Sequence, residues 1–261
     1  SPVEIEVSLS AEEAGVLARG AWIRMARVLK TDDAHVREKV AAMFTRREKA
    51  QALAGIVMAN AAQQAFDTLG VAFLLTPQFT LPDEWDEQEA VTFTTRAFPV
   101  PDMNLDLETP IERADGEAAD KAVVVLPADG LRQRLHGAMP AALLEAATKE
   151  RREAFRSELA AAGQTYREYR IENGVKPAEV EARLESEARE KLEEDIALDL
   201  MFLRKNLEAT DADEFEALSS LKPGSEQELK REFLETGHAC LLRQEARRRA
   251  AVRWTVENLV A

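Results

Sequence analysis

The sequence of 261 residues has little of what most enzymes and secreted proteins need. It has a single cysteine, Cys240, so no disulfide can form within the chain, and we expect a reducing, cytoplasmic compartment. No stretch approaches the roughly 20 apolar residues that cross a bilayer. Residues 1–10 alternate polar and apolar side chains and carry two glutamates, unlike a signal peptide. We therefore expect no membrane partner.

Signals of catalysis are also scarce. A glycine-rich phosphate loop, a CxxC pair and a GxSxG elbow are all missing. The three histidines fall on separate predicted elements, and His238 with Cys240 lacks the further ligands that a metal site requires. The sequence thus predicts no enzyme, no metal and no cofactor, and a structural role for Cys240.

Charge, by contrast, is abundant. Charged residues make up 31% of the chain, the formal net charge is −14, and aromatic residues are only 6%. Such a composition is typical of long helices with solvated faces. The excess of acids repels nucleic acid from the chain as a whole, so we predict no specific nucleic-acid site.

The first hundred residues predict a β-α-α-β-β unit. Apolar and polar side chains alternate over residues 3–9, the period of a half-buried strand. Ser10 and Glu13 then have capping-box spacing, so a helix begins there and reaches about Leu29. The segments expected after it are a helix over residues 35–69, extended segments over residues 71–81 and 90–100, and a solvated acidic loop over residues 83–89.

The rest of the chain is predicted to be helical after a linker within residues 99–120. One long helix, over residues 177–207, carries apolar side chains at every fourth position, a single apolar stripe, so we expect its first half to lie on a surface and its second half within a bundle. The other expected helices span residues 127–137, 140–162, 165–171, 211–218, 225–236 and 238–259. We therefore predict the α+β class, with domains over residues 1–108 and 123–261 and a linker over residues 109–122.

A basic segment stands out against the acidic background. Between Arg24 and Lys49 there are eight basic and four acidic residues, a net charge of +4. Such a patch is suited to RNA or an acidic partner, and it is equally an ordinary charged face of two helices. Its candidate partner-binding residues are Arg24, Arg27, Lys30, Asp32, Asp33, Arg46 and Arg47.

In this order of elements the sequence resembles bacterial trigger factor along nearly its whole length. The amino-terminal resemblance lies in Val-Ser-Leu-Ser-Ala-Glu-Glu at residues 7–13, Gly-Val at 70–71, and Phe-Thr-Thr at 93–95 before Pro99. The carboxy-terminal resemblance lies in Gly-Gln-Thr-Tyr-Arg-Glu-Tyr at 163–169, Gly-Val-Lys-Pro at 174–177, and residues 196–218 and 250–260. It implies a chaperone that holds unfolded or nascent polypeptides without ATP.

Two departures from the family pattern change what the resemblance implies. The family's Gly-Phe-Arg-x-Gly-Lys docking loop is replaced by Lys-Thr-Asp-Asp-Ala-His at residues 30–35, so repulsion from Asp32 and Asp33 should weaken ribosome binding. The prolyl-isomerase domain that the family inserts between its two halves does not fit into residues 99–120. We therefore expect no isomerase activity.

What remains of the family's function is a helical surface for unfolded chains. Such a surface needs exposed apolar side chains on a rigid frame, ringed by charge. The candidate client-binding residues are Met139, Leu143, Leu144, Phe155 and Leu159. Two alternatives stay open, a scaffold or adaptor with a dedicated partner and a chaperone of a secreted compartment, and so does dimer formation.

Overall fold

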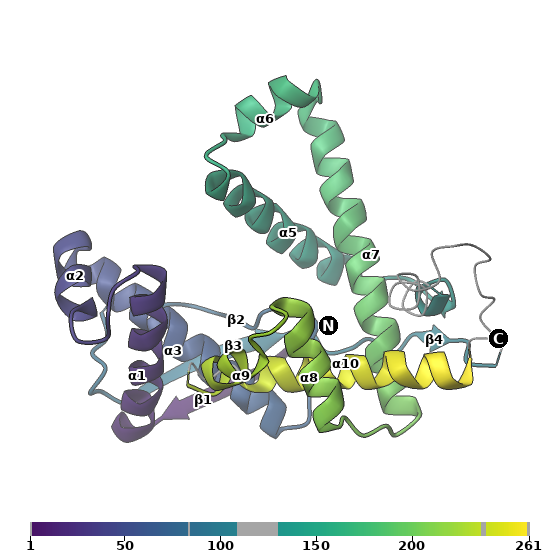
Figure 1. The fold of residues 1–261 in the computed structure, drawn as a ribbon, viewed down its shortest axis with the longest axis horizontal. Helices are drawn as coiled ribbons and strands as arrows, with labels where there is room; N and C mark the ends of the chain where they lie inside the picture. The colour runs from purple at the N-terminus through teal and green to yellow at the C-terminus, as the bar shows by residue number, and fades with distance from the viewer. Residues whose placement is uncertain (1, 83, 109–129, 236–238, 260–261) are drawn as a thin grey trace. The chain divides into compact units, whose positions relative to one another are not determined.

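The computed structural model describes residues 2–82, 84–108, 130–235 and 239–259 (Figure 1). It divides into two compact units. The sheet unit contains Pro2–Pro99 and Glu208–Ala250, and the arm unit contains Val100–Leu207 and Ala251–Ala261. The predicted domain boundaries stay a prediction, but this division joins residues 208–250 to the amino-terminal part of the chain. The predicted linker over residues 109–122 lies outside the described residues.

A three-stranded antiparallel sheet organises the sheet unit. Its central strand is β3 (Val91–Ala97), flanked by β1 (Val3–Leu9) and by the two-residue β2 (Gln78–Phe79). β1 pairs along its full length with β3, from Val3 opposite Ala97 to Leu9 opposite Val91. The extended segment predicted over residues 71–81 is therefore wrong in extent, since only β2 and a bridge between Phe73 and Pro99 pair with other strands.

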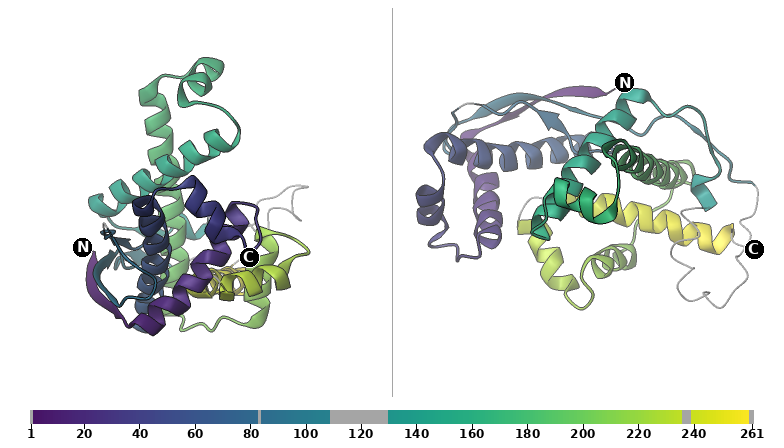
Figure 2. Two further views of the ribbon diagram at one scale, coloured as in Figure 1. Left: turned by 90° about the vertical axis from the view of Figure 1, so that its left-hand side faces the viewer. Right: turned by 90° about the horizontal axis from the view of Figure 1, so that it is seen from above.

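Three helices precede β2, namely α1 (Ala11–Val28), α2 (Val36–Met43) and α3 (Arg46–Thr68). The predicted capping box opens α1, because the Ser10 side chain accepts from the Glu13 amide while the Glu13 carboxylate accepts from Ser10. Figure 2 shows the sheet strands running along α3. Trp22 of α1 and Val57 of α3 share one core cluster, and Phe93 of β3 packs with Met58 of α3 in another.

The single helix predicted over residues 35–69 is wrong, because the chain breaks at Phe44. Phe44 is extended, and Thr45 opens α3 with a second capping box, in which its side chain and that of Glu48 each accept a backbone N–H from the other residue. This Thr-x-x-Glu pattern is as clear in the sequence as the one at Ser10. It satisfies amides at the start of α3 that a continuous helix would bond internally.

The sheet unit is completed by α8 (Asp211–Leu221), α9 (Glu226–Glu235) and the first part of α10 (Ala239–Asn258). Leu218 of α8 and Leu242 of α10 lie in one apolar cluster. Gln63 of α3 accepts a hydrogen bond from the buried Cys240 thiol, at 3.5 Å. Burial raises the pKa of that thiol, which fits the structural role predicted for it.

The arm unit contains β4 (Asn104–Leu105), β5 (Leu135–His136), α5 (Ala141–Ala161), α6 (Tyr166–Asn173) and α7 (Pro177–Arg204). β4 and β5 pair antiparallel. The helix predicted over residues 127–137 is therefore wrong at its carboxyl end, and residues 127–129 lie outside the described part of the chain. Arg204 of α7 donates to the Met103 and Leu105 carbonyls, which fixes the segment around β4.

The predicted α+β class is confirmed, with a small amino-terminal sheet and a mainly helical remainder. Two helix boundaries have the signals expected from the sequence, with Pro177 at the first position of α7 and a left-handed Gly174 after α6. None of the described helices combines the length and apolarity that a membrane crossing needs.

Candidate functional site

We use the name arm for α5, α6 and α7, which follow one another in the arm unit with α6 at the turn between the two longer helices (Figure 1). Its core consists of two facing stripes with a four-residue period. The buried residues are Leu143, Ala147, Phe155 and Leu159 on α5, and Val180, Leu184, Ala188 and Leu192 on α7. The stripe predicted for α7 is thus confirmed, and it packs against α5 rather than facing solvent.

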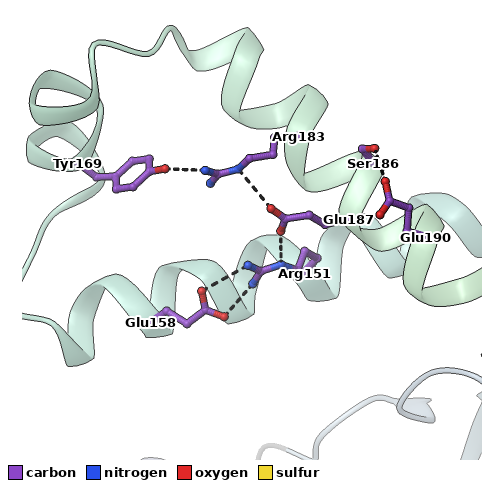
Figure 3. Close-up of polar contacts among 7 residues, drawn as sticks. All are labelled: Arg151, Glu158, Tyr169, Arg183, Ser186, Glu187 and Glu190. Atoms are coloured by element: carbon purple, nitrogen blue, oxygen red, sulfur yellow. Dashed lines mark hydrogen bonds and ion pairs between the residues drawn. The ribbon is translucent and has the colours of Figure 1, made fainter. Parts of the chain in front are cut away.

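Arg151 occupies the position of the α5 stripe between Ala147 and Phe155. Its guanidinium donates to Glu158 of α5 at 2.8 Å and to Glu187 of α7 at 2.7 Å, and Glu187 also pairs with Arg183 at 3.3 Å (Figure 3). These pairs are partly exposed, so each contributes little to stability alone, and of the three it is Arg151 with Glu187 that joins α5 to α7.

The turn of the arm is also held by specific contacts. Tyr169 of α6 meets Phe155 edge-to-face with ring centroids 5.1 Å apart, and its hydroxyl accepts from Arg183 at 2.6 Å. Thr165 and Glu168 form the capping box of α6. Ile171 of α6 packs against none of this and is 68% exposed. The arm therefore presents an apolar side chain on a rigid turn.

The loop between α1 and α2 carries the acids of the predicted docking position. Asp32 accepts from the His35 backbone amide at 2.9 Å and lies 2.7 Å from Nδ1 of the same residue. The hydrogen bond from the His35 side chain lowers the pKa of Asp32, and the same contact raises the pKa of His35. Lys30 adopts a left-handed conformation with φ of 50°. Asp32 and Asp33 are both exposed, and Asp32 also holds the turn through its contacts with His35.

The remaining residues of the predicted basic patch divide into two groups. Arg24 and Arg27 lie exposed on α1, and Arg27 pairs with Glu232 of α9 at 3.0 Å. Arg46 and Arg47, at the start of α3, instead line a groove of about 470 Å³. Its far wall is the acidic segment of residues 84–89, which we call the acidic strap. The structure does not gather all the predicted partner-binding residues at one site.

The acidic strap is a loop with mostly exposed side chains, as predicted, but it is also anchored at Glu87, which the prediction did not include. The Glu87 carboxylate accepts from Trp22 Nε1 at 2.5 Å and from Arg37 at 2.5 Å, and the Arg37 guanidinium lies 4.4 Å from the centre of the Trp22 ring. Burial alone would raise the pKa of Glu87, yet its pKa is lowered because Arg37 and Trp22 donate to the carboxylate. The predictions from the sequence considered the basic segment and the acidic segment separately. Their opposite charges could have predicted that they lie together, as Arg37 and Glu87 do.

The comparison with protein families supplies the remaining evidence. The family described as "Bacterial trigger factor protein (TF) C-terminus" matches residues 100–257, which is more than half of the chain. The chain belongs to the bacterial trigger factor family. The match contains the whole arm and does not include β1, α1, α2, α3, β2 or β3. Curated proteins and solved structures gave no significant match to the chain.

Within the trigger factor match, the five predicted client-binding residues do not share one environment. Leu143, Phe155 and Leu159 are 2%, 6% and 7% exposed and hold α5 against α7. Met139 and Leu144 are half-buried at the amino end of α5. The exposure of Ile171 was not predicted because α6 is short and has no apolar stripe, so its sequence gives no sign of which side faces solvent.

Two further observations bear on chemistry in this trigger factor relative. Among residues 2–82, 84–108, 130–235 and 239–259, no three His, Cys, Asp or Glu side chains approach as metal ligands would. In the arm, the charges of Arg151, Glu158 and Glu187 pair with one another.

Proposed function

We propose that the protein is an ATP-independent holdase chaperone that binds unfolded or nascent polypeptides through its arm, with no isomerase activity. The observation that carries this proposal is the arm itself. It lies inside the trigger factor match, the apolar stripes of α5 and α7 pack together in its core, and its turn presents Ile171 to solvent. Membership of the family supports a chaperone-like role, and the single buried cysteine supports a cytoplasmic setting.

The arm is suited to binding unfolded chains because its packed helices carry a few apolar side chains that are exposed to solvent. Ile171 is exposed, and Met139 and Leu144 are half exposed with flexible side chains that adapt to different clients. Partly exposed pairs of Arg and Glu elsewhere on the arm, such as Arg152 with Glu181, keep its surface soluble. We assign client contact to these three residues, and to Leu143, Phe155 and Leu159 the role of holding the frame.

Replacing Ile171 with serine should weaken client binding because a contact on the turn is lost. We expect roughly a threefold to tenfold higher Kd for a permanently unfolded, labelled model protein, since burying a large aliphatic side chain is worth about 1.5–3 kcal/mol and this one is buried only in part. Leu221→Ser is the matched control, because Leu221 is 62% exposed on α8, outside the arm. Equal losses in both variants would show that the arm has no special role.

The alternative of a scaffold or adaptor rests on the loop between α1 and α2. Asp32 and Asp33 place two carboxylates at the docking position, and Asp32 is built into the turn that leads to α2. We propose that ribosome binding is weak and depends on salt through basic residues such as Arg24 and Arg46. A dedicated partner would then replace the ribosome.

Removing the exposed acid should reveal this repulsion. Asp33→Ala is expected to strengthen low-salt association with ribosomes, while the turn held by Asp32 stays intact. Co-sedimentation over a salt series measures it, and Glu38→Ala on the exposed side of α2 controls for a general change of charge. Weaker binding by Asp33→Ala would mean that the acidic loop is itself a contact.

A further inference from the structure

The groove between α3 and the acidic strap has the chemistry of a carboxylate-binding site. One wall is the first two turns of α3, which contribute Arg46, Arg47, Lys49, Ala50 and Leu53. Glu87, which also lines the groove, accepts hydrogen bonds from Arg37 and from the Trp22 indole N–H. The Arg37 guanidinium and the Trp22 indole N–H both donate to one carboxylate, and Lys49 lies 5.5 Å from the centre of the same indole ring. Together these groups form a specific binding site for a carboxylate.

The acidic strap fills this site only in part. Trp85 packs against the core between α1 and α3, and its indole N–H donates to the Glu89 carbonyl at 3.3 Å. Glu87 is half-buried, whereas Glu84, Asp86 and Glu89 are exposed. A groove of about 470 Å³ stays between the strap and α3, a volume typical of ligand sites. The strap is therefore held at Trp85 and Glu87 and does not pack along its length.

We propose that this face of α1, α2 and α3 binds an acidic polypeptide segment with an aromatic side chain, and that the acidic strap occupies the site as an intramolecular competitor. The strap itself shows the chemistry that the site accepts, since it combines carboxylates with an indole. Tethering gives it an effective concentration in the millimolar range, so a partner binds strongly only when the strap is displaced. The site lies outside the matched residues 100–257 and does not depend on the arm.

Loosening the anchor should open the site. The probe is a labelled synthetic peptide with the sequence of residues 82–90, Pro-Asp-Glu-Trp-Asp-Glu-Gln-Glu-Ala. We expect Glu87→Gln to raise its affinity for the full chain about tenfold, because the charge-assisted bonds from Arg37 to the strap are lost while the site keeps its cations. Adding Arg37→Gln to that variant should abolish the gain.

The matched control is Glu84→Gln, which removes the same charge from the same strap and leaves the Glu87 anchor in place. It should raise peptide affinity less than about twofold, a change expected of surface charge alone. Equal gains in the two variants, or no gain in Glu87→Gln, would overturn the proposal. So would a gain in binding to oligouridylate without a gain for the peptide, which would make the face an RNA site.

A second measurement uses the unaltered chain and does not depend on how the variants fold. Hydrogen exchange at the backbone amides of residues 84–89 should accelerate when the peptide is added at millimolar concentration, because the strap leaves its place. The amides of α5 should not change. Unchanged or slower exchange in the strap under saturating peptide would contradict displacement.

Discussion

Replacing Phe155 with alanine should destabilise the arm by about 3–5 kcal/mol, the cost of removing a buried phenylalanine and leaving a cavity. Phe155 is 6% exposed and packs with Leu184 of α7. Its ring also meets Tyr169 of α6 edge-to-face and lies 5.2 Å from the Arg183 guanidinium. The substitution thus removes contacts from all three helices of the arm at once.

Hydrogen exchange resolved along the chain measures this effect, because the two compact units need not unfold together. Exchange in α5, α6 and the first half of α7 should accelerate strongly, while β1 and β3 keep their protection. Phe215→Ala is the matched control, since Phe215 is 57% exposed on α8 and the same truncation there should cost less than about 0.5 kcal/mol. Equal effects would show that Phe155 does not hold the arm together.

The features that the sequence predicts well are local. The four-residue period of α7 follows from Val180, Leu184 and their successors, and the capping box at Ser10 marks the start of α1. Both signals depend on residues within one or two helical turns of each other, so neighbouring residues are enough to predict the helix. The capping-box pattern at Thr45 also indicates the break between α2 and α3. It was overlooked because residues 35–69 otherwise have the composition of one continuous helix.

The features that the sequence leaves open are contacts between distant segments. α10 contributes to the sheet unit through Arg243, which pairs with Asp67, and through Gln244, whose side chain donates to the Phe73 carbonyl. The two pairs are separated by 176 and 171 positions, and nothing local marks either one. For the same reason the period of α5 shows that Phe155 lies on an apolar stripe without showing whether α7 or a client covers it.

The chaperone proposal predicts a large effect in the presence of an aggregating protein. Holding an unfolded chain lowers the concentration of exposed apolar segments that associate with one another, and apolar contacts do not weaken with salt as phosphate contacts do. Suppression should therefore persist in high salt and need no nucleotide. Phe155→Ala should lose most of it, because the arm no longer keeps its shape, whereas Phe215→Ala should retain it.

The most direct measurement is light scattering of a chemically unfolded model protein diluted into buffer with and without the full chain. At several-fold molar excess and without ATP, we predict that the chain suppresses most of the scattering, and that Ile171→Ser raises the amount of chain required. Scattering that is unchanged at this excess, with the chain shown to be folded by circular dichroism, would contradict the holdase function and favour a scaffold with a dedicated partner.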